Sequence, residues 1–353
     1  DILEKLWYSV NTNELFNIDE KAVDNIKNLN LQKINFPQLL HQSKDILNNR
    51  GLDTSRIRAL LDEYIDEDKI RSSNVDLGIV TVDLTDKKPM ELLKEDIPYG
   101  RLADFLIASS YLPAFKSEEM DGKKYLDGGF YNNLPVGLLV KKGYKNIIAV
   151  RTMGIGVVRK VRDKDVKVTY IQPAEGSLGT IFETLDFDRE KTDELIKLGY
   201  YDTMKVFKKL KGFKYYCIPY EGDFVEILAK YFVENGDKIK KVAEILGFDD
   251  ISLDRAFFEK IMPRLENILD IKGNADYEDI CIRLAERIAE KLKIERFKIY
   301  NTIDFLNVTI EIFQKNPISF TKNVPAFIKH SKILSLAVKD DLIVEFFSEL
   351  FLK

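Results

Sequence analysis

The chain has 353 residues, of which 45% are hydrophobic, so it is long enough to bury a substantial core, and two domains are expected. Its 54 basic and 58 acidic residues leave a net charge of −4, which excludes a strongly basic nucleic-acid-binding protein. Nucleic acid is therefore not an expected partner.

Helix and strand patterns alternate in the first part of the chain. Apolar residues at helical spacing predict helices over residues 2–10, 54–65, 102–110, 136–142 and 188–211. Runs of β-branched and aromatic residues predict strands over residues 75–84, 146–152, 168–173 and 213–219. This order is typical of an α/β fold, and we expect the strands to share one sheet.

Local signals set several ends of these elements. Asp53 or Thr54 is the expected N-cap of the second helix, and Gly143 is placed to end the fourth. The helix from Leu102 must end before Pro113, because the residue before a proline is pushed out of the α region. The nearly continuous apolar run over 146–152 predicts a buried strand.

The pattern changes near Tyr220, after which nearly every segment shows helical spacing. We therefore expect an α/β domain over residues 1–220 and a helical domain over residues 221–353.

Cysteine and hydropathy patterns bear on the compartment. Only Cys217 and Cys281 occur, far apart and in apolar surroundings, which fits neither a disulfide framework nor a metal-ligand spacing. No apolar run approaches the ~18 residues of a membrane span, and the first residues are amphipathic rather than a signal peptide. The sequence predicts a cytoplasmic protein.

Several familiar catalytic arrangements have little support. His41 and His330 are the only histidines, and neither lies beside an obvious nucleophile, so a Ser-His-Asp triad is disfavoured. The chain lacks an H-E-x-x-H motif and clustered Cys or His residues, so no metal is expected.

Two glycine-containing segments also fall short of a motif. The segment MGIGVVRK has Gly154 and Gly156 but lacks the third glycine and the following helix of a dinucleotide fingerprint, so a loop leaving the sheet is favoured and no cofactor is expected. Ser177 in EGSLGT lies one place too early for a G-x-S-x-G nucleophile turn and is interpreted as a loop serine.

Asp127 is the remaining catalytic candidate. It lies in YLDGGFYNNLP, where Asp-Gly alone is a common hairpin-turn signal. Its context differs from a simple turn, because ASSYLPAF (residues 108–115) precedes it and NNLPV enters a helix after it. The combination resembles the patatin-like phospholipases, in which a D-G-G or D-G-A stretch carries the catalytic aspartate.

The resemblance covers about residues 1–220 and implies a mostly parallel sheet flanked by helices. The helical remainder resembles the C-terminal extensions of some bacterial members. In this family an aspartate is the base for a serine in G-x-S-x-G, which makes Asp127 the expected base without any histidine. Burial must raise the pKa of such a carboxyl for it to accept a hydroxyl proton.

The residues after Asp127 have expected supporting roles. Gly128 and Gly129 would permit unusual backbone angles and a close approach to the serine's turn. Asn132 or Asn133 would cap the helix entering at Pro135 or hold the loop, and neither is assigned a catalytic role.

The nucleophile itself is missing from these 353 residues, since no G-x-S-x-G occurs and no glycine-rich oxyanion segment is found. In the family both precede the element that here begins at Asp1. We therefore expect the chain to carry only the aspartate half of a Ser-Asp dyad and to be inactive alone. Three explanations are open: another chain supplies the missing N-terminal segment, the native protein has residues that this sequence lacks, or the domain covers its sheet in another way. The second is favoured, because the local signals of the remaining elements are intact.

The leading functional hypothesis is a serine lipid acyl hydrolase of phospholipase A type, with a lipid or acyl-ester substrate and no cofactor. The alternative is a non-catalytic scaffold whose helical domain binds a protein or a membrane surface, which would add peripheral membrane contact. Residues 332–352 provide apolar area for a lipid interface, although packing within the helical domain is the favoured interpretation. The basic runs 207–214 and 237–242 are interpreted as solvated helix faces rather than as anionic-lipid contacts.

Overall fold

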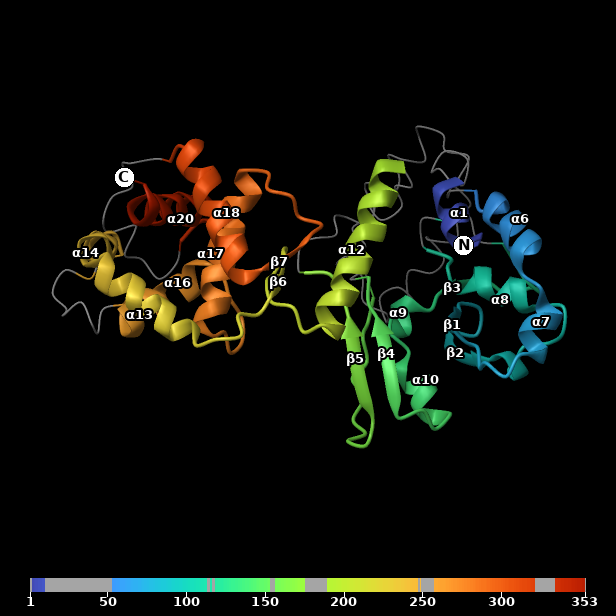
Figure 1. The fold of residues 1–353 in the computed structure, drawn as a ribbon. Helices are drawn as coiled ribbons and strands as arrows, with labels where there is room; N and C mark the ends of the chain where they lie inside the picture. Colours follow the sequence, from blue (N-terminus) through green and yellow to red (C-terminus); the bar gives the residue numbers. More distant parts are fainter. Residues whose placement is uncertain are drawn as a thin grey trace. The chain divides into compact units, whose positions relative to one another are not determined.

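The computed structural model divides into two compact units, Asp1–Gly199 and Tyr200–Lys353 (Figure 1). The structure describes residues 2–9, 53–112, 115, 118–152, 156–174, 189–246, 248, 257–320 and 334–352. The division falls inside helix α12 (Arg189–Phe207), which is about one helix earlier than the boundary expected near Tyr220.

The first unit contains an antiparallel sheet with the strand order β2-β1-β3 (Figure 1). Its strands are β1 (Gly78–Asp83), β2 (Lys88–Leu93) and β3 (Tyr125–Asp127). The central strand β1 is almost entirely buried, as its β-branched residues predict. β2 was not predicted; it is an edge of the sheet, where Pro89 is tolerated.

Two predicted helices, α6 (Ser55–Tyr64) and α8 (Leu102–Ala108), accompany this sheet, together with the short helix α7 (Glu67–Ser72), which was not predicted. Thr54 occupies the N-cap position of α6, but Asp53 supplies the side chain, whose Oδ1 accepts from the Ser55 N–H at 2.9 Å. α8 ends before Pro113, as predicted. A short 3₁₀ turn (η2, Lys94–Asp96) follows β2, and helix α1 (Ile2–Ser9) begins the described chain.

A parallel pair of strands, β4 (Asn146–Val150) and β5 (Lys167–Ile171), forms a second sheet. It is preceded by α9 (Gly129–Asn132) and α10 (Val136–Lys141), and Gly143 ends α10 with φ +95°, as its position predicts. β4 was expected to be buried throughout, but Ile148 is 58% exposed and alternate residues face outward. The apolar run therefore reflects strand propensity and one packed face, not burial on both faces.

The expected class, a mixed α/β part followed by a helical part, is confirmed. The strand arrangement differs from the single, mostly parallel sheet that was expected. Among the described residues the strands form three small sheets, and the one that holds Asp127 is antiparallel.

The second unit is built from helices around one large hydrophobic core. Predicted helical segments correspond to α13 (Phe224–Glu234), α14 (Gly236–Ile245), α16 (Met262–Ile268), α17 (Tyr277–Lys291), α18 (Thr302–Lys315) and α20 (Leu336–Phe351). A π-helical turn, η3 (Phe257–Ile261), leads directly into α16.

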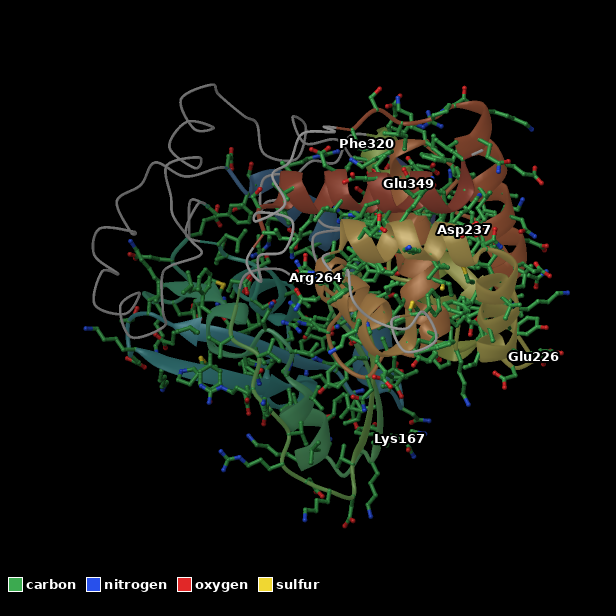
Figure 2. All side chains as sticks on the ribbon, turned by 90° about the vertical axis from the view of Figure 1, so that its left-hand side faces the viewer. Lys167, Glu226, Asp237, Arg264, Phe320 and Glu349 are labelled. Carbon is green, nitrogen blue, oxygen red and sulfur yellow. The ribbon has the colours of Figure 1, made fainter. Side chains whose placement is uncertain are left out.

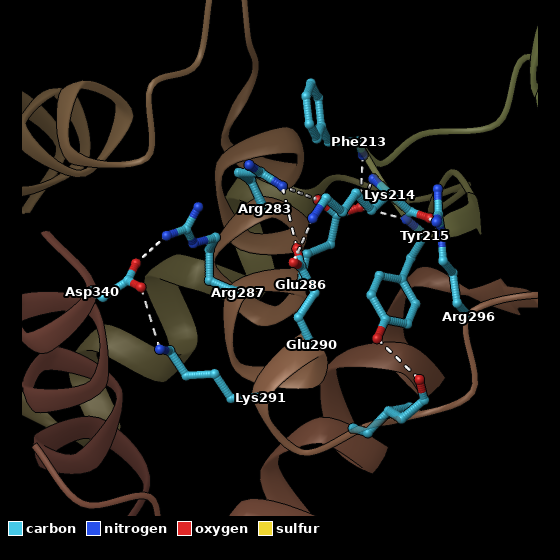
Figure 3. A network of polar contacts seen from close by, with 11 residues as sticks. Phe213, Lys214, Tyr215, Arg283, Glu286, Arg287, Glu290, Lys291, Arg296 and Asp340 are labelled. Atoms are coloured by element: carbon cyan, nitrogen blue, oxygen red, sulfur yellow. Dashed lines mark hydrogen bonds and ion pairs between the residues drawn. The ribbon is translucent and has the colours of Figure 1, made fainter. Parts of the chain in front are cut away.

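A small parallel strand pair, β6 (Tyr216–Ile218) with β7 (Ile299–Asn301), also belongs to the second unit. The expectation that residues 213–219 join the sheet of the first unit is therefore wrong. The physical reason is visible in the contacts of the segment before β6, which α17 holds in place (Figure 3).

The buried carboxylate of Glu286 makes that contact (Figure 3). Its Oε1 accepts from the backbone N–H groups of Phe213, Lys214 and Tyr215 at 2.6, 2.9 and 2.8 Å, and its Oε2 accepts from Arg283 at 3.0 Å. A buried carboxylate without such partners would be strongly unfavourable. The interaction fixes residues 213–215 to α17.

Helix α20 packs inside the second unit, against α14 and α17. Figure 2 labels Glu349 on α20 and Asp237 on α14. Leu342, Phe346 and Phe347 are buried in the large core, so the proposed lipid-facing surface of residues 332–352 is wrong for these side chains. Helix α20 packs within the helical unit, which was the favoured interpretation.

The basic runs are partly engaged in ion pairs. Lys211 contacts Asp276 and also lies 3.1 Å from Glu278, and Lys214 lies 2.7 Å from Glu290. These two lysines therefore fasten the segment before β6 to α17 instead of forming a free cationic face.

Candidate active site

Asp127 is the last residue of β3, in register with Thr81 of β1. Its backbone N–H donates to the carbonyl of Tyr111 at 2.7 Å. The Thr81 hydroxyl is buried and lies 3.1 Å from the carbonyl oxygen of Ala108 and 2.9 Å from that of Leu126. These hydrogen bonds hold the backbone at the end of β3 in place. They therefore fix the position from which the Asp127 side chain extends.

The two positions after Asp127 have no room for an added side chain. A Cβ on Gly128 would lie 2.0 Å from the carbonyl oxygen of Val80, and one on Gly129 would lie 2.8 Å from Asn133 Oδ1. Gly128 has φ −61°, so the expected unusual backbone angle is absent there. The close approach is real, but among the described residues it is to the backbone of β1 and to the side chains of Asn133 and Asp127.

Among the described residues, the backbone donor of the Asp127 carboxylate is the Gly129 N–H, at 2.6 Å from Oδ1. Burial raises the pKa of Asp127 to about 6, and the Gly129 hydrogen bond opposes this rise only in part. A carboxyl with this pKa is ionised at neutral pH and is a stronger proton acceptor than an exposed aspartate. These are the properties that a general base requires.

The two asparagines of this segment differ in their surroundings. The helix α10 begins with Pro135 at its N-cap position and no side chain caps it, so the capping role expected for Asn132 or Asn133 is not found. The Asn133 N–H donates instead to the carbonyl of Val157 at 2.7 Å, which holds the loop. Asn132 is buried, and its Oδ1 has no partner among the described residues.

The two serines of the ASSYLPAF segment donate to backbone carbonyls of helix α8. The hydroxyl of Ser109 donates to the carbonyl of Leu106, and that of Ser110 to the carbonyl of Ile107, each at 2.8 Å. The backbone carbonyl of Ser109 accepts from the Gly128 N–H at 3.3 Å. The segment before Pro113 therefore supports the Asp-Gly-Gly turn through its backbone.

The described residues of the first unit contain no histidine and no cysteine. His41, His330 and Ser177 lie outside the described residues. Both cysteines are unpaired thiols of the second unit; burial raises the pKa of Cys281 to about 12 and also raises that of Cys217, which disfavours the reactive thiolate.

The described ranges contain no group of three or more His, Cys, Asp or Glu side chains suited to a metal ion. No helix within those ranges is long and apolar enough to cross a bilayer. An open groove of about 420 Å³ lies elsewhere in the first unit, lined by Lys5, Tyr8, Ser9 and Arg189.

One contact of this site was missed in the sequence. Gly156, interpreted only as part of a loop leaving the sheet, packs directly against Gly129 and Asn133. Its signal was a pair of glycines, Gly154 and Gly156, after a predicted strand, which does not say where in the fold the close approach occurs.

Comparison with known proteins found a family model that matches part of the chain. Residues 2–140 match the family model described as Patatin-like phospholipase, and this range ends inside α10. This part of the chain is thus patatin-like and contains Asp127 with both glycines. The match supports a lipid hydrolase in general terms. No curated protein and no solved structure matches the chain.

Proposed function

We propose that the protein is a lipid acyl hydrolase of phospholipase A type in which Asp127 is the general base of a Ser-Asp dyad. The supporting observation is the partly buried carboxylate at the end of β3, held by the Gly129 N–H and with a pKa raised to about 6. The patatin-like match over residues 2–140 provides the substrate class, lipids or related acyl esters. No metal or cofactor takes part in the proposed chemistry.

The nucleophile in this proposal is a serine on a G-x-S-x-G turn, a motif that the 353 residues do not contain. These residues therefore supply only the base. By themselves they would not hydrolyse a lipid ester through the dyad.

The proposed reaction has two proton transfers to Asp127. The serine oxygen attacks the ester carbonyl while Asp127 accepts the hydroxyl proton, and that proton goes to the leaving alcohol as the acyl-enzyme forms. Water then attacks the acyl-enzyme, again losing a proton to Asp127, and the serine regains a proton as the fatty acid leaves.

The oxyanion of each intermediate needs donors other than the two glycines. The Gly128 N–H already donates to Ser109, and the Gly129 N–H donates to Asp127 itself. We propose that the oxyanion donors, like the serine, are supplied outside these residues.

The proposed compartment is the cytoplasm, since both cysteines are free thiols, with lipid reached by peripheral contact. The scaffold alternative loses its main support, because the apolar side chains of α20 from Leu342 to Leu350 are buried in the core of the second unit.

The test is hydrolysis of a short-chain chromogenic ester and of mixed phospholipid vesicles by the full-length protein, with Asp127→Asn. Asp121→Asn is the matched control, since the Asp121 side chain is 79% exposed in the turn that precedes β3. We expect Asp127→Asn to lower kcat by at least ~100-fold and Asp121→Asn to leave it unchanged. Equal activity in all three proteins would contradict the proposal.

A further inference from the structure

We propose that residues Gly156–Arg159, which follow β4, act as a clamp that positions Asp127 by holding α9 in place. The clamp binds α9 through backbone, steric and aromatic contacts. This inference rests on the proposed role of Asp127 as the base. It assigns a positioning role, not a catalytic one, to Gly156 and Arg159.

The backbone contact joins the clamp to both ends of α9. The Val157 N–H donates to the carbonyl of Gly129 at 3.0 Å, and the Val157 carbonyl accepts from the N–H of Asn133 at 2.7 Å. One residue of the clamp thus bonds to the first residue of α9 and to the residue that follows its last.

The steric contact explains why residue 156 is a glycine. Its φ of +153° is rare for residues with a side chain. A Cβ there would lie 2.5 Å from the Gly129 carbonyl oxygen and 2.7 Å from the Cβ of Asn133. Both obstacles belong to α9 or its end, so any side chain at 156 would push the clamp away from it.

The side-chain contact closes the clamp. The Arg159 Nε donates to the carbonyl of Tyr131 at 3.1 Å, and its guanidinium lies over the Tyr131 ring, 4.0 Å from the ring centroid. A planar guanidinium can make both contacts together, whereas a lysine ammonium has no such plane.

α9 depends on such outside contacts because it has only four residues, too few to be stable alone. On one side Phe130 packs with Val82 and Leu126 of the antiparallel sheet. The clamp binds the backbone at both ends of α9 through hydrogen bonds. Since α9 begins at Gly129, movement of this helix would move the N–H that binds the Asp127 carboxylate.

The test uses Gly156→Ala and Arg159→Met in the full-length protein. Gly143→Ala is the control for backbone strain, since Gly143 also has positive φ but no atom lies within 4 Å of its added Cβ. Arg162→Met, in the same loop, is the control for loss of one exposed guanidinium. The Asp127 carboxyl is titrated by ¹³C NMR with labelled aspartate, assigned with Asp127→Asn, and kcat and KM are measured separately.

We expect Gly156→Ala to raise the titration midpoint of Asp127 by about 0.5 unit or more, because the Gly129 N–H, whose hydrogen bond lowers the pKa of this carboxyl, moves away from it. We expect kcat to fall by up to ~100-fold with little change in KM, as misplacement of a base predicts. Arg159→Met should act in the same direction more weakly, and the two controls should match the wild type.

The clamp would be overturned if the titration midpoint of Asp127 is unchanged in folded Gly156→Ala and Arg159→Met. If Gly156→Ala does not fold, the midpoint in Arg159→Met is the test. The NMR readout needs no activity. It therefore separates failure of the clamp from failure of the proposed function, which would appear as full activity in Asp127→Asn.

Discussion

The Asp127 Oδ1 lies 2.6 Å from the backbone nitrogen of Gly129, two residues further along the chain. This hydrogen bond favours the ionised carboxylate, while burial of the side chain disfavours it, and burial has the larger effect. The protein therefore keeps a carboxylate in a position that costs stability, as expected for a group retained for chemistry.

The first prediction concerns the stability of Asp127→Asn. The folded-state pKa of Asp127, about 6, lies above its ordinary value of 3.8, so between these values the folded state binds more protons than the unfolded state. Its contribution to stability therefore falls as pH rises through this window. Asp127→Asn should increase the free energy of unfolding at pH 7.5 by roughly 1–3 kcal/mol, with the gain shrinking towards zero near pH 4.

Urea unfolding at the two pH values checks this prediction, with Asp121→Asn as the control that should show no such pH-dependent gain. A loss of stability in Asp127→Asn at pH 7.5 would mean that the carboxylate stabilises the fold.

The second prediction separates the two glycines. In Gly128→Ala the new methyl group meets the backbone carbonyl of Val80, which cannot rotate away, so we expect a loss of more than ~2 kcal/mol of unfolding free energy. In Gly129→Ala the obstacles are the side-chain oxygens of Asn133 and Asp127, so stability should change less while kcat falls by up to ~100-fold.

Gly137→Ala in α10 is the matched control, because no atom lies within 4 Å of its added Cβ. It should leave activity unchanged and should be neutral or stabilising by up to ~1 kcal/mol. Equal effects of Gly128→Ala and Gly129→Ala on stability and on kcat would contradict the assignment.

The third prediction concerns Glu286 in the second unit. Glu286→Gln keeps the size of the side chain but weakens the acceptor that serves three backbone N–H groups, so we expect a loss of about 2–3 kcal/mol in guanidinium unfolding. Glu311→Gln on α18, an exposed position, should stay within ~0.5 kcal/mol of the wild type. If both variants unfold like the wild type, Glu286 is not what holds residues 213–215.

The fourth prediction concerns α20. Phe347→Ala removes a fully packed ring from the large core and should lower the free energy of unfolding by about 3–5 kcal/mol. Leu336→Ala, at a position that is 73% exposed, should be nearly neutral. Liposome flotation should not distinguish Leu336→Ala from the wild type; weaker lipid binding in that variant would restore a membrane role for this helix.

Most elements were predictable because their signals are local. Helical spacing and caps located α6, α8 and α10, and the β-branched run located β1. Pairing between strands is not local, which is why β6 was assigned to the wrong unit: its partner β7 lies about 80 residues further along the chain. The Glu286 carboxylate on α17 binds the backbone just before β6, and no local sequence pattern predicts this contact.

In the candidate site, too, local features could be predicted from the sequence and non-local contacts could not. The motif around Asp127 could be found in the sequence because its residues are adjacent. The clamp could not, since Gly156 and Arg159 reach α9 only after β4 and its loop are folded. The reason for Gly128 also needed the structure, because its neighbour is a carbonyl of another strand and not an unusual φ.

The most direct test of the central claim is the pH dependence of kcat/KM for phospholipid hydrolysis by the full-length protein, compared with Asp127→Asn. The account predicts that the wild type loses activity below an inflection near pH 6, since Asp127 must be ionised to accept the serine proton, and that this inflection is absent from the residual activity of Asp127→Asn. An Asp127→Asn protein with wild-type activity and the same inflection would contradict the account.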